Sequence, residues 1–89
     1  MIAMTHLVAP LHIHDALILR SALRRELFAA SLTVTRGEAE LEDLRLTHAA
    51  AEKVAQSERR LAARRGWHRR CAALLEQHEA RYFPPPVRP

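Results

Sequence analysis

The chain has 89 residues and a formal net charge of +4, and 48% of its residues are hydrophobic although only 4% are aromatic. A chain of this length forms one domain at most, with a small core, because it buries only about 60–65% of the surface that its unfolded form exposes. It contains no run of about eighteen apolar residues, which excludes a membrane-spanning helix and leads us to expect a cytoplasmic protein.

Alanine, leucine and arginine dominate the composition, and these residues favour helix most strongly. The predicted fold class is all-α, either a helical hairpin or a three-helix unit with coiled-coil-like seams. Small helical chains often gain stability by oligomerising, so we expect this one to form a homo-oligomer.

Residues 1–13 are predicted to form an irregular N-terminal arm, because Pro10 disfavours helix. The arm carries His6, and His12 and His14 follow with one residue between them. Neither a defined strand nor a helical pair at i and i+4 positions these histidines, and no cysteine accompanies them. We therefore predict no metal site here and no cofactor anywhere in the chain.

A single helical domain is predicted over 14–83, and its first helix over about 15–32. Asp15 is the expected N-cap of this helix. Leu23 and Leu27 mark its main apolar face. Further apolar residues widen that face, so the helix is expected to be covered on two sides. They are Leu17, Ile18, Phe28 and Leu32.

The segment Thr33–Gly37 is predicted to interrupt the helix, because β-branched residues and glycine both weaken helical structure. Thr35 and Glu38 also have the spacing of a capping box, which would begin a second helix over about 36–65. One alternative is a continuous helix, supported by a heptad register that crosses the segment without a slip. That register is Leu23, Leu27, Ala30, Val34, Gly37, Leu41, Leu44, His48, Ala51 and Ala55.

The packing seam of the second helix is predicted to contain Leu41, Leu44, His48 and Leu61. His48 would be a polar seam residue that fixes the register of the helices. Gly66 is the expected C-cap, because glycine is common just beyond a helix end.

A third helix is predicted over 67–83, with Trp67, Cys71, Leu74 and Leu75 on its apolar face. A helix that continued through Gly66 would place Arg60 and Arg64 on this same face, which favours a break. The lone Cys71 is expected to be a small core residue. The Pro-rich tail, 84–89, cannot be helical.

Charge is divided along the chain. Six acids and two bases lie between Gly37 and Glu58, whereas the segment from Arg59 to Arg70 has six bases and no acid. The basic block consists of Arg59, Arg60, Arg64, Arg65, Arg69 and Arg70. Paired arginines suit phosphate recognition. However, a five-residue repeat turns about 140° around a helix, so the pairs would not share one face.

No arrangement of residues indicates catalysis, so we predict a protein that is not an enzyme. The predicted function is a small helical protein–protein interaction module, of adaptor, chaperone or inhibitor type, that self-associates and binds an acidic or helical protein. In this hypothesis the basic block contacts the partner or the acidic segment of another copy. Such ion pairs determine the orientation of the partner more than they increase its affinity. The alternative is a regulatory protein that binds nucleic acid through the same arginines.

Overall fold

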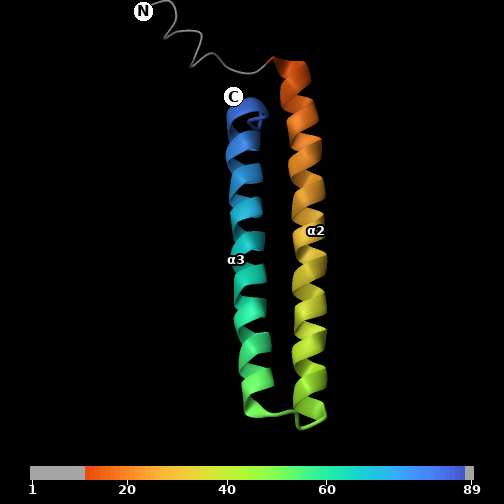
Figure 1. Ribbon diagram of the computed structural model, residues 1–89. Helices are drawn as coiled ribbons and strands as arrows, with labels where there is room; N and C mark the ends of the chain where they lie inside the picture. Colours follow the sequence, from red (N-terminus) through yellow and green to blue (C-terminus); the bar gives the residue numbers. More distant parts are fainter. Residues whose placement is uncertain (1–11, 88–89) are drawn as a thin grey trace, which may run out of the picture.

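The chain folds into an antiparallel helical hairpin, shown in Figure 1 by a computed structural model that describes residues 12–87. Helix α2 runs over Ile13–Leu46 and helix α3 over Ala51–Tyr82, and the two pack along their whole length. The all-α prediction is confirmed, and the hairpin is the one of the two predicted architectures that is observed. Most of the predicted arm lies outside the described residues.

Helix α2 begins two residues before the predicted start. His12, not Asp15, is its N-cap, and the His12 Nδ1 accepts a hydrogen bond from the His14 backbone N–H at 3.3 Å. Asp15 instead lies in the first turn, where its negative charge interacts favourably with the helix dipole. The prediction of Asp15 as the N-cap was therefore wrong, because the His12 imidazole nitrogen accepts the capping hydrogen bond.

The predicted interruption at Thr33–Gly37 is also wrong, because α2 is continuous there. The Thr33 and Thr35 hydroxyl groups donate to the carbonyl groups of Ala30 and Ser31, one turn earlier, so neither threonine caps a new helix. Gly37 is buried against α3. Packing against α3 outweighs the weak helix propensity of the segment, as tertiary contacts often do.

The chain reverses at residues 47–50, where the sequence predicted unbroken helix. His48 adopts a left-handed φ of 55°, its N–H donates to the Arg45 carbonyl, and the Ala49 N–H donates to the Leu44 carbonyl at 2.9 Å. These two bonds around a left-handed residue form a Schellman motif. His48 is thus an exposed turn residue and not a seam residue, so the heptad register ends at Leu44.

Helix α3 passes through Gly66 without a break, so the predicted helices over 36–65 and 67–83 and the predicted C-cap are wrong. Gly66 does not adopt a positive φ. The expected conflict between Arg64 and its apolar neighbours does not arise, because Gly37 on α2 leaves space for the Arg64 side chain.

Helix α3 ends at Tyr82, and Phe83 is its C-cap. Pro84 follows and has no N–H to continue the helix, and residues 84–87 are not helical, as predicted. The Arg20 guanidinium group lies 3.9 Å from the centroid of the Phe83 ring. This cation–π contact joins the start of α2 to the end of α3.

The helices meet along an inner seam whose positions alternate three and four residues apart, as in a coiled coil. Every residue of this seam is buried or half-buried. On α2 the inner seam is Ala16, Arg20, Leu23, Leu27, Ala30, Val34, Gly37, Leu41 and Leu44. On α3 it is Val54, Ser57, Leu61, Arg64, His68, Cys71, Leu75, His78 and Tyr82.

Candidate functional site

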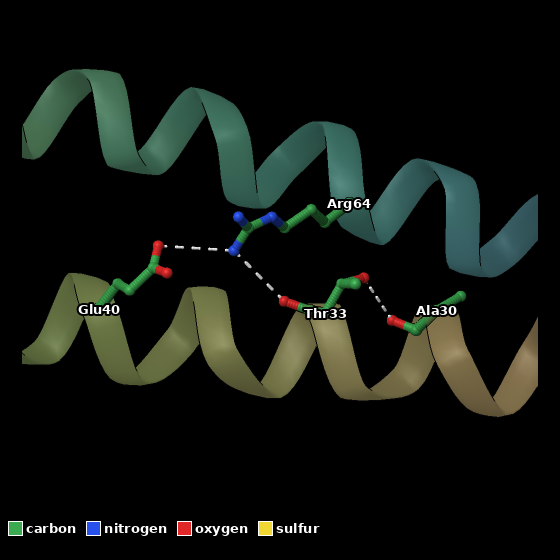
Figure 2. A network of polar contacts seen from close by, with 4 residues as sticks. All are labelled: Ala30, Thr33, Glu40 and Arg64. Carbon is green, nitrogen blue, oxygen red and sulfur yellow. Dashed lines mark hydrogen bonds and ion pairs between the residues drawn. The ribbon is translucent and has the colours of Figure 1, made fainter.

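Arg64 occupies the middle of the inner seam, where a hydrophobic residue would be usual. Figure 2 shows its Nη1 donating to the Thr33 carbonyl oxygen at 3.4 Å and to the Glu40 carboxylate at 3.5 Å. A Cβ at Gly37 would lie 2.9 Å from this nitrogen. The absence of a side chain at Gly37 therefore lets Arg64 lie between the helices, where its contacts to α2 help to fix the register.

Two histidines of the inner seam also bind α2. The His78 Nε2 donates to the Ala16 carbonyl oxygen at 2.8 Å, and the His68 Nε2 lies 3.0 Å from the Ser31 hydroxyl. Among the described residues, no buried side-chain nitrogen or oxygen is without a hydrogen-bond partner. Because these polar side chains make hydrogen bonds between the two helices, we assign them a structural role.

Ion pairs line one edge of the hairpin. Arg24 pairs with Glu79 at 3.1 Å, and Arg45 pairs with Glu58 at 3.7 Å. The third pair on this edge, Glu38 with Arg65 at 3.4 Å, joins the acidic segment to the basic block within one chain. Arg64 and Glu40 do the same. Part of the charge that was expected to contact another molecule is therefore paired inside the hairpin.

The structure divides the six residues of the basic block into two groups. Arg64 and Arg65 turn toward α2, whereas the other four are exposed and take part in none of the ion pairs found within residues 12–87. These four residues are Arg59, Arg60, Arg69 and Arg70. Arg59, Arg69 and Arg70 lie on the side of α3 that faces away from α2, whereas Arg60 lies beside the inner seam, seven residues before Trp67. We call the four the outer arginines.

The apolar residues predicted to form the packing seam have unequal burial. Leu41, Leu61 and Cys71 are buried. Four leucines are half-buried in the inner seam, namely Leu23, Leu27, Leu44 and Leu75. Trp67 and Leu74 remain 47% and 46% exposed. They lie beside the inner seam, and Leu74 lines an open groove of about 320 Å³ together with Leu19 and Tyr82.

The side of α2 that faces away from α3 is unusually apolar. Ile18, Phe28 and Leu46 are 61%, 66% and 71% exposed, and Leu32 is 43% exposed. Ile18, Leu32 and Leu46 recur at multiples of seven residues. Each lies two residues from an inner-seam position, which is about 200° around the helix axis. We call this surface, together with Phe28, the outer face of α2.

Sequence reasoning identified Ile18, Phe28 and Leu32 as an excess of apolar surface, and it expected this helix to be covered on two sides. The hairpin provides one neighbour only, and that neighbour is on the opposite side. Large exposed apolar side chains grouped on one face usually mark an interaction surface. The seven-residue spacing that extends the outer face to Leu46 was present in the sequence and was the missed signal.

Comparisons with family models, with curated proteins and with solved structures find no match to this chain. Within residues 12–87, neither helix is both long enough and apolar enough to cross a membrane. The same residues contain no group of three metal-binding side chains, and His6 lies outside them. The surfaces of the hairpin are therefore the observations from which function is argued.

Proposed function

We propose that the protein is a non-enzymatic helical interaction module that self-associates through the outer face of α2. The observation that carries this proposal is the exposure of Ile18, Phe28, Leu32 and Leu46 on one side of a helix whose other side is already packed. Burial of one such side chain is worth about 1.5–3 kcal/mol. Four of them give a strong driving force for a second helix to cover this face.

The thin core of the hairpin supports the same proposal. Two helices can bury only one stripe of each other, and in this chain that stripe includes Ser57, Arg64 and His78. Small helical chains with so little apolar core often obtain the rest of their stability from a partner. The outer arginines, which are exposed on α3, would remain available to an acidic protein.

Light scattering and thermal unfolding at several protein concentrations test the proposal. We expect an oligomer whose melting temperature rises with concentration, because association stabilises the folded state by mass action. Leu32→Glu should dissociate it while helicity by circular dichroism is retained. Ala73→Glu is the matched control, since Ala73 is exposed on the outward side of α3 and the substitution adds the same charge. A wild-type protein that stays monomeric at every concentration would refute the proposal.

A second candidate function is nucleic-acid binding. It is favoured by the outer arginines, four exposed cations of α3 that form no ion pair among the described residues. Such binding weakens steeply as salt increases. Arg69→Glu with Arg70→Glu should abolish it, whereas Arg65→Glu, which removes an intramolecular pair, is the matched control. If no DNA or RNA is retarded by the wild-type protein at low salt, this candidate is excluded.

A further inference from the structure

We infer that two copies of the chain pair antiparallel through the outer faces of their α2 helices, with Leu32 on the two-fold axis. The inference rests on the proposed self-association and specifies its geometry. Its occupant is a second copy of this chain, and the arguments for it are the spacing of the apolar residues and the distribution of charge along α2.

The seven-residue stripe of the outer face, which leaves out Phe28, is symmetric about Leu32. Ile18 lies fourteen residues before it and Leu46 fourteen residues after it. In an antiparallel pair centred on Leu32, Ile18 of one copy therefore lies opposite Leu46 of the other, and the two Leu32 side chains meet. Every large apolar residue at these seven-residue positions then has an apolar partner. The two-fold pair therefore buries both ends of the stripe, Ile18 against Leu46 at each end.

The stripe stays on one side of α2 because the helix is part of a coiled coil. In a straight helix, residues seven apart drift by about 20° per heptad, but supercoiling removes this drift. The inner seam keeps its seven-residue repeat from Ala16 to Leu44 without losing contact with α3. The outer face follows the same repeat on the opposite side, so it forms a continuous docking surface of about 42 Å from Ile18 to Leu46 that follows the gentle supercoil of the hairpin.

Charge favours the antiparallel over the parallel arrangement. Arg25 lies on the outer side of the first half of α2, and Glu42 and Asp43 lie on the outer side of the second half. None of the three takes part in an ion pair within residues 12–87. An antiparallel pair places Arg25 of each copy within about one turn of Glu42 and Asp43 of the other. A parallel pair would place Glu42 and Asp43 of one copy beside Glu42 and Asp43 of the other, and these like charges would repel.

Cysteine crosslinking in the full chain tests the geometry, with Cys71→Ala as the background because Cys71 is the only native cysteine. A disulfide requires Cα atoms no more than about 7 Å apart, so it reports close pairs only. Under mild oxidation, Leu32→Cys should shift from the 10.1 kDa monomer to a dimer on a non-reducing gel. Ile18→Cys alone should not shift, whereas a mixture of Ile18→Cys and Leu46→Cys chains should form the crosslinked heterodimer.

A charge exchange gives a second readout that does not depend on oxidation. Arg25→Glu should weaken the dimer in light scattering, and adding Glu42→Arg with Asp43→Arg should restore it. All three side chains are exposed, so the hairpin itself should keep its helicity.

The outcomes separate the geometry from the proposed function. Self-crosslinking of Ile18→Cys would show a parallel pair and overturn the inference while self-association stands. A dimer by light scattering that crosslinks at none of the three positions would place the interface elsewhere, which would overturn both the geometry and the proposed role of the outer face. A strict monomer would overturn both, and would mean that the outer face is covered by another segment or another protein.

Discussion

Replacement of Gly66 by alanine tests whether α3 is one continuous helix. An added Cβ at Gly66 would find one neighbour, the Arg69 Nη2 at 3.9 Å, which is an ordinary van der Waals contact. Glycine within a helix is about 0.8–1.0 kcal/mol less favourable than alanine. Because the site is in the middle of α3 and has no positive φ, Gly66→Ala should raise the free energy of unfolding by about 1 kcal/mol.

Gly37→Ala is the matched comparison, because it brings the same gain in helix propensity at a site with no room. A Cβ at Gly37 would lie 2.9 Å from the Arg64 Nη1 and 3.1 Å from the Leu61 Cδ1. Arg64 would have to move away from Thr33 and Glu40, and overpacking typically costs about 1–3 kcal/mol. Gly37→Ala should therefore leave stability unchanged or lower it.

Urea unfolding followed by circular dichroism measures both variants. Protein concentration must be the same in every titration, because self-association would add to the measured stability. With a urea dependence of about 1–3 kcal/mol per molar, a gain of 1 kcal/mol moves the midpoint by roughly 0.3–1 M. This shift is well above the error of a midpoint.

The predictions for Gly66→Ala and Gly37→Ala are refuted by different results. If Gly66 were the residue just after a helix end, with a left-handed φ, alanine would be strained there and the midpoint would fall. A lower midpoint for Gly66→Ala would therefore refute the continuous α3. If Gly37→Ala gained as much stability as Gly66→Ala, the close approach of Arg64 and Leu61 to Gly37 would be refuted instead.

Three further predictions concern the inner seam, the turn and the edge of the hairpin that is lined by ion pairs. Leu61→Ala leaves a cavity at a buried position and should lower the free energy of unfolding by about 2–5 kcal/mol in the same urea titration, and an unchanged midpoint would contradict its burial. His48→Gly relieves a left-handed φ and should raise the thermal midpoint, whereas a decrease would argue against the Schellman motif. A double-mutant cycle on Glu38 and Arg65, both about half exposed, should give a coupling of about 0–1 kcal/mol that weakens with salt, so a coupling above this range would be inconsistent with so exposed a pair.

The inner seam of α2 could be read from the sequence between Leu23 and Leu44, although only as the alternative to a break, whereas the turn could not be predicted. The heptad register from Leu23 to Leu44 was readable because the spacing of apolar residues is a local property of the sequence. The reversal after it has neither glycine nor proline, and its left-handed residue is a histidine, so no local signal marked it. The two glycines, Gly37 and Gly66, which predicted breaks, are both inside helices.

The arginines of the basic block show the same limit of prediction from sequence. The five-residue repeat of the arginines predicted that they would not share one face of a helix, and the structure agrees. Which of them would be paired could not be read from the repeat, because Arg64 and Arg65 meet Glu40 and Glu38 only after the chain reverses. The position of the turn decides every contact between the helices.

The sequence by itself determined that the chain is helical, that each helix has an apolar stripe, and that α2 has more apolar surface than one neighbour covers. These properties follow from composition and from the angle that each residue turns along a helix. Only the tertiary structure decided that Gly37 receives Arg64, that the acidic segment folds back onto part of the basic block, and that three of the outer arginines lie on the side of the hairpin opposite the outer face of α2. Each of these depends on the register between two helices, and the chain fixes that register through side-chain hydrogen bonds between residues 24 to 62 positions apart.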